Sequence, residues 1–142
     1  MMIAIQQLTD ADMDVLHPML AEAYWSVGIP RETVARACAN SMCAISRDDA
    51  GRLIGFARLV TDRTVFAWLC DVIVAPPHRG RGIGRGLAHA LMSQPDTQTV
   101  RRWMLGTADA HGVYRELGFG PIRVPERLME IIKPAHYRAA LG

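Results

Sequence analysis

Four glycines at alternate positions carry the clearest chemical signal in the sequence. The run reads Arg79-Gly80-Arg81-Gly82-Ile83-Gly84-Arg85-Gly86 and lies between a hydrophobic stretch and an amphipathic helical pattern. Because glycine has no Cβ, backbone N–H groups in such a run can approach a ligand closely, and a helix N-terminus adds about half a positive charge. The run therefore predicts a loop that binds a diphosphate, with the arginines adding mobile positive charge.

Two familiar nucleotide-binding loops do not fit this run. The dinucleotide pattern G-x-G-x-x-G lacks its third glycine, and the P-loop pattern lacks its lysine. Hydride transfer and P-loop phosphoryl transfer therefore lose their support. The remaining structural alternative is a glycine-rich turn with solvated arginines, although glycine is unfavourable inside a helix unless a close approach requires it.

The elements around the loop follow from hydrophobic periodicity and from turn residues. The chain begins with an expected strand and two helices, of which the first contains Pro18 and should be kinked or split by it. The expected strands are 3–8, 42–47, 53–61, 65–74, 103–107 and 128–132, and the expected helices start at Ala11, at Pro30, at Gly82 and at Asp109. Strands before and after a central helix predict a mixed sheet with helices on its faces, an α/β sandwich.

Length and composition limit the classes of protein that fit. The chain has 142 residues, half of them hydrophobic and 21% charged, which predicts one folded domain over residues 1–142 and excludes intrinsic disorder. A net charge of +2 argues against nucleic acid or a membrane surface as the main partner. The three cysteines have no metal-binding spacing, so no metal site is expected. The longest apolar run, Val65–Val74, is too short to cross a membrane, and with no secretory signal at the N-terminus we expect a cytoplasmic protein.

Three motifs resemble those of one family. Arg79–Gly84 fits [RQ]-x-x-G-x-[GA] at every defined position, Val74–Gly80 resembles the lead-in V-x-P-x-x-R-G, and Tyr114–Phe119 resembles Y-x-x-x-G-F. In this order the motifs are similar to those of the GNAT superfamily of acyl-CoA-dependent N-acetyltransferases. The resemblance covers essentially the whole chain.

The resemblance implies a fold and a reaction. The expected fold is α/β, with a mixed, mostly antiparallel central sheet splayed between its fourth and fifth strands and helices on both faces. The implied reaction is direct transfer of the acetyl group of acetyl-CoA to a primary amine of a small acceptor. A module of the same fold that binds acyl-CoA as a sensor, without catalysis, is the alternative.

The resemblance also places the cofactor. Backbone N–H groups of the glycine loop would surround the coenzyme A diphosphate, and the exposed strand before the loop would lie beside the pantetheine arm, where an N–H polarises the thioester carbonyl. The implied cofactor-binding residues are Val72, Ile73, Val74, Arg79, Gly80, Arg81, Gly82, Ile83, Gly84 and Arg85.

Acetyl transfer to an amine needs a base for the ammonium proton and an acid for the leaving thiolate. By resemblance, Tyr114 is the expected general acid. Asp71 is a candidate base, because burial in an apolar strand would raise its pKa, but alternation places it on the face opposite to Trp68 and Cys70 unless a bulge intervenes. His111 and Asp109 are rivals, and a water relay without a dedicated base is equally open.

The sequence says less about the acceptor amine and about the oligomeric state. Tyr24, Trp25, Phe66 and Trp68 could form aromatic walls for a small amine. Many family members have Asn where this chain has Thr107, whose hydroxyl could still bond the pantetheine. We expect a homodimer in which the apolar strand 128–132 extends a sheet across a twofold axis.

Overall fold

The computed structural model describes residues 2–133 and residue 137. Five strands form one sheet: β1 (Met2–Ile5), β2 (Met42–Arg47), β3 (Leu53–Thr61), β4 (Phe66–Val74) and β5 (Arg102–Leu105). Four α-helices accompany them: α1 (Asp10–Glu22), α2 (Arg31–Ala39), α3 (Ile83–Met92) and α4 (His111–Glu116). Among these described helices, none is long and apolar enough to cross a membrane.

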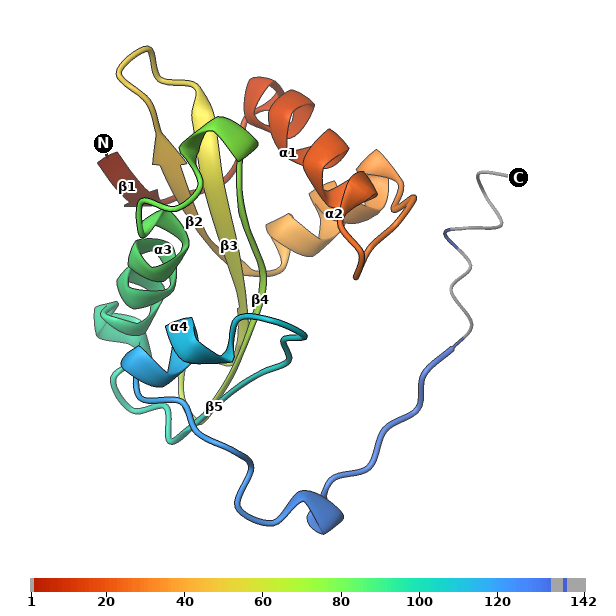
Figure 1. Cartoon of the computed structure of the whole chain (residues 1–142), viewed down its shortest axis with the longest axis vertical. Helices are drawn as coiled ribbons and strands as arrows, with labels where there is room; N and C mark the ends of the chain where they lie inside the picture. Colours follow the sequence, from red (N-terminus) through yellow and green to blue (C-terminus); the bar gives the residue numbers. More distant parts are fainter. Residues whose placement is uncertain (1, 134–136, 138–142) are drawn as a thin grey trace.

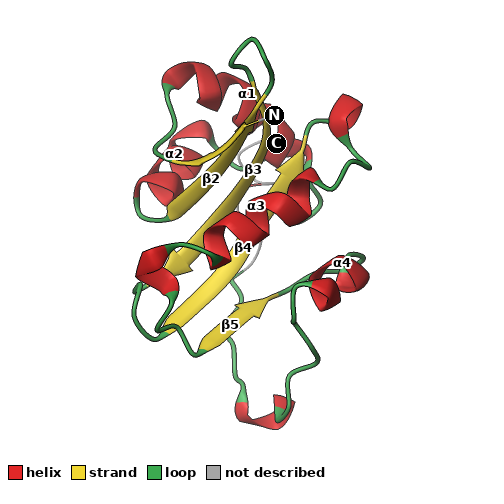
Figure 2. Ribbon diagram, turned by 90° about the vertical axis from the view of Figure 1, so that its left-hand side faces the viewer, coloured by secondary structure: helices red, strands yellow, loops and turns green. Residues whose placement is uncertain are grey.

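The strands lie in the order β1-β2-β3-β4-β5, and each joins its neighbour in antiparallel fashion except β4 and β5, which are parallel. α3 crosses one face of the sheet, and α1 and α2 cover the other (Figures 1 and 2). This confirms the mixed, mostly antiparallel sheet with helices on both faces.

Alternation along β2 assigns its side chains to two separate cores. Met42 and Ala44 pack with α3 in one core, whereas Cys43 and Ile45 pack with α1 and α2 in the other. Strand side chains point alternately to the two faces of a sheet, so a strand covered on both sides is buried along most of its length. β2 is buried at five of its six residues.

β4 and β5 are paired over only part of their length. The register runs from Phe66 opposite Arg102 to Leu69 opposite Leu105, and beyond Leu69 the strand β4 continues to Val74 without β5 beside it. Figure 2 shows the two strands diverging toward α4. The expected splay between the fourth and fifth strands is therefore present, and it leaves the second half of β4 with a free edge.

Apart from element ends, such as β1 ending at Ile5 rather than residue 8 and β5 ending at Leu105 rather than residue 107, two expected elements differ from the structure. Pro18 lies within a single helix α1 and does not split it. The expected strand 128–132 is wrong: this segment has no regular secondary structure and runs away from the body of the molecule (Figure 1). A β-strand needs an adjacent strand for its backbone hydrogen bonds, and this segment does not reach one within the described chain.

Candidate active site

A β-bulge in β4 turns Asp71 toward the splay. Phe56 lies opposite Ile73 and Arg58 lies opposite Cys70, so two residues of β4 face one residue of β3. Asp71 adopts a left-handed backbone conformation with φ of 53°. The bulge breaks the alternation of the strand, and Asp71 lines the same cavity as Trp68 and Cys70.

Two side chains from distant parts of the sequence hold the carboxylate of Asp71. Trp25 Nε1 donates to Oδ1 over 2.9 Å, and Arg58 Nε donates to Oδ2 over 2.9 Å. A second nitrogen of Arg58 donates to Ser41 Oγ at 3.1 Å. The sequence analysis did not identify Arg58, although a single arginine within the apolar segment of β3 next to a single aspartate in β4 was an available signal.

The cavity in the splay has a volume of about 280 Å³. Its walls come from the segment after α1, from β4, from β5 with the loop that follows it, and from α4. The residues that line it are Tyr24, Trp25, Trp68, Leu69, Cys70, Asp71, Val72, Leu105, Gly106, Thr107, Asp109, Ala110 and Tyr114. Three of the four expected aromatic residues are therefore present, whereas Phe66, at the start of β4, does not line the cavity.

Tyr24 and Trp25 form a connected aromatic wall. Their rings meet edge to face with centroids 5.0 Å apart, and the Tyr24 hydroxyl accepts a hydrogen bond of 3.2 Å from the backbone N–H of Ala108. This bond ties the segment after α1 to the loop after β5. The Tyr24 side chain thus connects two walls of the cavity.

Tyr114, on α4, is one of the residues that line this cavity. Burial raises the pKa of its hydroxyl above the usual value, and the nearby carboxylate of Asp109 raises it further. The phenol is therefore protonated at neutral pH. No hydrogen-bond partner of this hydroxyl occurs among the described residues, so the proton is available to a ligand.

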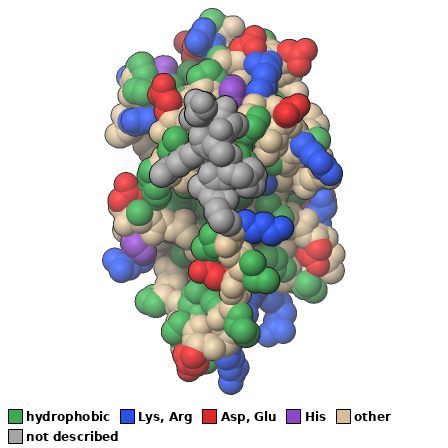
Figure 3. Space-filling model, turned by 90° about the vertical axis from the view of Figure 1, so that its right-hand side faces the viewer, with side chains coloured by type: hydrophobic (Ala, Val, Ile, Leu, Met, Phe, Trp, Pro, Cys, Tyr) green, Lys and Arg blue, Asp and Glu red, His purple; other side chains and the backbone are tan. Residues whose placement is uncertain are grey.

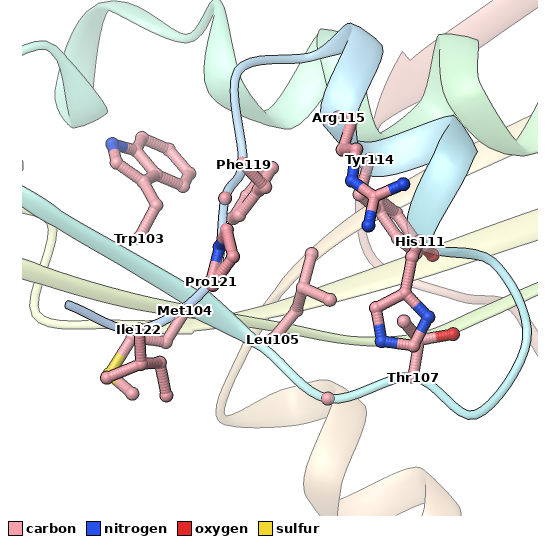
Figure 4. A pocket seen from close by; sticks show the side chains of 12 residues that line it. Trp103, Met104, Leu105, Thr107, His111, Tyr114, Arg115, Phe119, Pro121 and Ile122 are labelled. Atoms are coloured by element: carbon pink, nitrogen blue, oxygen red, sulfur yellow. The ribbon is translucent and has the colours of Figure 1, made fainter. Parts of the chain in front are cut away.

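Tyr114 also lines a second cavity of about 360 Å³, which lies between β5 and α4 (Figure 4). The two cavities share Leu105, Gly106, Thr107 and Tyr114. His111 lines only this second cavity, whereas Asp109 lines only the first. Of the two rival bases, Asp109 therefore lines the same cavity as Asp71, whereas His111 does not.

The cavity is also lined by two other polar groups, the Thr107 hydroxyl and the Cys70 thiol. The Thr107 hydroxyl accepts a hydrogen bond of 3.1 Å from the backbone N–H of Ala110, which holds the turn before α4. Burial raises the pKa of the Cys70 thiol to about 11, so this thiol is protonated at neutral pH and is a poor nucleophile. Across the described residues, no group of three His, Cys, Asp or Glu side chains could hold a metal ion.

The glycine loop presents backbone at the N-terminus of α3. Gly80 and Gly82 both have φ of 78°, a left-handed conformation that favours glycine, and a Cβ on either would meet no atom within 4 Å. The space beside these residues is open. Gly82 is the N-cap of α3 and makes no side-chain cap, which leaves the first N–H groups of the helix directed at that space.

Two of the three loop arginines, Arg79 and Arg85, bond within the protein. Arg79 Nε donates to the backbone carbonyl of Val74 at 3.0 Å, which ties the loop to the end of β4. Arg85 forms an ion pair of 2.6 Å with Glu116 of α4, and both side chains are about half exposed. Arg81 is exposed. The anion-binding capacity of the loop therefore lies mainly in its backbone.

Two comparisons with known proteins agree with this arrangement. Residues 5–119 match the model of the acetyltransferase (GNAT) family. A structure from Xanthomonas campestris, assigned to the same family, is 39% identical and superimposes with a TM-score of 0.87 over 96% of this chain and 97% of that one. A structure from Clostridium acetobutylicum, described as an acetyltransferase with acetyl-CoA, is 15% identical and has a TM-score of 0.66 over 92% of this chain and 96% of its own, which shows a shared fold.

Curated relatives are similar over shorter stretches. An uncharacterised N-acetyltransferase of Porphyra purpurea is 32% identical over 97 residues, 63% of this chain and 55% of the relative. The mycothiol acetyltransferase of Acidothermus cellulolyticus is 36% identical over 78 residues, 54% of this chain and 24% of the relative. The chain thus matches about half or less of the length of these relatives. With the family match over residues 5–119 and the splayed sheet, the chain belongs to the GNAT acetyltransferase family.

Proposed function

We propose that this protein transfers the acetyl group of acetyl-CoA to the primary amine of a small acceptor, by direct attack of the amine on the thioester. One observation carries the proposal: the cavity between β4 and β5 contains a protonated tyrosine and a carboxylate pair, and the free edge of β4 leads from it to the N-terminus of α3. Acetyl-CoA has a thioester at one end of its pantetheine arm and a diphosphate at the other. These two groups match the cavity and the N-terminus of α3, respectively.

The backbone would hold the cofactor. In the proposed complex, the N–H groups of residues 80–85 bind the diphosphate, and the partial positive charge of the α3 N-terminus adds to this binding. The pantetheine arm would lie along Val72, Ile73 and Val74, where β4 has no neighbour on the β5 side. A backbone N–H of this edge would stabilise the oxyanion that forms when the amine attacks the carbonyl carbon.

Tyr114 is the proposed general acid. Attack by the amine forms the new C–N bond, and collapse of the tetrahedral intermediate breaks the C–S bond and leaves a thiolate. Tyr114 donates its proton to that sulfur. The raised pKa of the phenol keeps this proton in place until the thiolate forms.

Asp71 is the proposed base. Each carboxylate oxygen accepts one hydrogen bond from the protein, and a carboxylate offers about four acceptor positions, so room remains for an ammonium N–H or a water. Asp109 is the second candidate, because it lines the same cavity and its carboxylate has no partner among the described residues. Asp71 is held by Arg58 and Trp25, whereas Asp109 has no such partner in the described part of the chain, so the two aspartates are compared by substitution.

The cavity lining suggests the class of acceptor. Tyr24, Trp25 and Trp68 provide aromatic faces and edges, and Asp71 and Asp109 provide negative charge. Aromatic faces attract cations, and carboxylates bind ammonium groups through charge-assisted hydrogen bonds. A volume of about 280 Å³ suits a small molecule, so we propose a compact amine with an apolar body.

The test is a two-stage measurement on the full chain. Calorimetry first measures binding of acetyl-CoA, and a thiol-release assay then follows turnover over a panel of arylalkylamines, aliphatic diamines and amino acids. Release of coenzyme A above the rate without amine supports the proposal. Tight binding of acetyl-CoA with no turnover over the whole panel would instead support the acyl-CoA sensor.

A further inference from the structure

Three apolar side chains lie exposed on the sheet face that α1 and α2 partly cover. Val60 is 41% exposed, and Phe66 and Trp68 are each 37% exposed. The two helices pack on the other end of this face, where Phe56 and Ile73 are buried. Figure 3 views the molecule from the side of α1 and α2 and shows hydrophobic side chains at the surface among charged ones. Val60, Phe66 and Trp68 are here named the apolar shelf.

The strand register makes the apolar shelf one continuous surface. Trp68 of β4 lies directly opposite Val60 of β3, and Phe66 is two residues before Trp68 on the same strand. Paired residues on neighbouring strands share a face of the sheet, and so do residues two apart on one strand. At a rise of about 3.3 Å per residue, the shelf therefore extends about 7 Å along β4 from Trp68.

Trp68 connects the apolar shelf to the cavity in the splay. It lines that cavity together with Asp71. A Cβ on Gly106 would lie 3.9 Å from both Cζ2 and Cη2 of Trp68, so the indole ring extends to the end of β5. Val60 and Phe66 do not line the cavity. A molecule whose amine lies in the cavity can therefore continue over the indole onto these two side chains.

The charges at the two ends of this path are opposite in sign. The cavity end carries the carboxylates of Asp71 and Asp109, which suit an ammonium group. At the other end the register places Arg102 of β5 beside Phe66, and the exposed side chain of Arg102 has no ion pair among the described residues. A second ammonium group at that end would be repelled by Arg102 and would lose hydration on the shelf. The path therefore favours a tail without positive charge.

We infer that the acceptor is a primary amine with a linear apolar tail, whose amine end occupies the cavity and whose tail lies on the apolar shelf. Contiguous exposed apolar side chains mark a binding surface, and an alkyl tail gains free energy by leaving water for such a surface. The inference rests on the proposed function and extends it, because the cavity by itself selects only a compact amine. Val60 and Phe66 are then specificity-determining residues that do not touch the reacting atoms.

The first experiment measures binding of propylamine, pentylamine and octylamine to the full chain by calorimetry, with coenzyme A present so that no acetyl transfer takes place. Full burial of a methylene group strengthens binding about 4-fold, and a one-sided shelf buries about half of its surface, which gives about 2-fold per methylene. We therefore expect octylamine to bind about 30-fold more tightly than propylamine. The eight-carbon diamine should bind at least about 10-fold more weakly than octylamine, because its second charge loses hydration on the shelf.

Substitutions on the apolar shelf test its residues. In the double variant Val60→Thr and Phe66→Thr, polar side chains of high strand propensity replace two exposed apolar ones, so the affinity ratio of octylamine to propylamine should fall from about 30 to below about 5. Each single variant should give an intermediate ratio. Phe66→Leu keeps an apolar surface at the same position and should keep most of the ratio. Ile3→Thr is the control elsewhere, since Ile3 is also 37% exposed but lies on β1 at the other edge of the sheet, and it should keep the parent ratio.

Turnover of the same amines with acetyl-CoA is measured separately, so the inference and the proposed function can fail independently. Length-dependent binding without release of coenzyme A would refute the proposed function and support the shelf. Equal binding of propylamine and octylamine, with turnover of either, would overturn the inference and support the proposed function. A double variant with the parent ratio, an Ile3→Thr variant that loses this ratio, or a diamine that binds as tightly as octylamine would also overturn the inference. So would a protein that binds none of these amines.

Discussion

Asp71 shows how one residue in an uncommon conformation can determine the character of a site. A left-handed backbone costs a non-glycine residue about 1–2 kcal/mol, and it persists only when the surroundings stabilise it. Here the ion pair with Arg58 and the hydrogen bond from Trp25 do so, with both distances at 2.9 Å. The three residues together fix one wall of the cavity and its charge.

Substitution of Tyr114 by Phe separates chemistry from binding. The ring that packs edge to face against Phe119 is kept, so the affinity for acetyl-CoA should change little. If the hydroxyl protonates the leaving thiolate, kcat should fall by about 10²–10⁴, the usual contribution of general acid catalysis. Calorimetry and the thiol-release assay measure the two effects. A variant with unchanged turnover would assign the proton to water.

Asp71→Asn and Asp109→Asn distinguish the two candidate bases. Each change removes a carboxylate of the same cavity while keeping the size of the side chain. If Asp71 is the base, its variant should lose about 10²-fold or more in kcat/KM, whereas the Asp109 variant should keep the rate of the parent. Steady-state rates of the parent and the two variants provide the comparison. The opposite pattern would transfer the role to Asp109, and two active variants would indicate a water relay.

At the scale of elements, the start of α3 determines anion binding. The helix begins directly after two glycines with φ of 78°, and the N–H groups of its first turn face open space. Gly84 is close to β4, since its Cβ would lie 3.4 Å from Val72 Cγ1, which explains a glycine inside the first turn. The close packing of Gly84 against Val72 therefore fixes the position of the glycine loop relative to β4.

Gly82→Glu should abolish binding of coenzyme A, because it places a bulky anion where the diphosphate belongs. Gly82→Ala is the matched control: it imposes the same left-handed strain of about 1–2 kcal/mol, and its methyl group meets no atom within 4 Å. We expect the alanine variant to be slightly less stable and still able to bind, as measured by calorimetry. Equal binding by the glutamate variant and the parent would exclude the loop as the diphosphate site.

α1 is fixed by a buried ion pair at its first turn. Thr9 and Asp12 form a capping box, and Arg47 of β2 donates to both carboxylate oxygens of Asp12, at 2.5 and 2.9 Å. The hydrogen bonds from Arg47 lower the pKa of Asp12 below 3.8. The folded-state pKa lies below the unfolded one, so this contribution to stability is present above about pH 4 and is lost as the pH falls through the folded pKa.

Asp12→Asn should therefore destabilise the protein by about 3 kcal/mol at pH 7, because the charge of Arg47 is left without its partner. Its stability should also vary less with pH below about pH 4 than that of the parent. Asp14→Asn on the same helix is the control, since it removes an exposed ion pair with Arg31 and should cost less than about 1 kcal/mol. Urea denaturation at pH 7 and pH 3.5 measures both. Equal losses in the two variants would contradict this account.

At the scale of the whole molecule, the sheet separates two hydrophobic cores, and the proposed cofactor slot opens where the sheet divides. α3 belongs to one core, and α1 and α2 to the other. A ligand in the splay would contact β4, the loop before α3, and α4. Binding should therefore stabilise the molecule as a unit.

Coenzyme A should raise the melting temperature in a concentration-dependent manner. At 100 times the dissociation constant, mass action contributes about 2.7 kcal/mol to stability. Pantetheine, which lacks the diphosphate, is the control ligand and should give little or no shift at the same concentration. Thermal unfolding by fluorescence measures both ligands. An equal shift with pantetheine would place the main binding energy outside the glycine loop.

The sequence by itself determined the features that depend on neighbouring residues. The glycines at 80 and 82 and the start of α3 are adjacent in the chain, so their composition and spacing predict the loop without knowledge of the fold. The order of strands and helices likewise follows from local periodicity. The motif of Arg79–Gly84, together with this order, indicated the GNAT family.

Only the tertiary structure decided the features that join distant segments. Asp71 contacts Trp25, 46 residues away, and Arg58, on the next strand, and the bulge that permits both contacts has no local sequence signature in β4. The expected strand 128–132 failed for the related reason that alternating apolar residues specify a strand propensity but not a partner. A strand forms only where its backbone groups meet another strand, and whether they do so depends on where the rest of the chain places that edge.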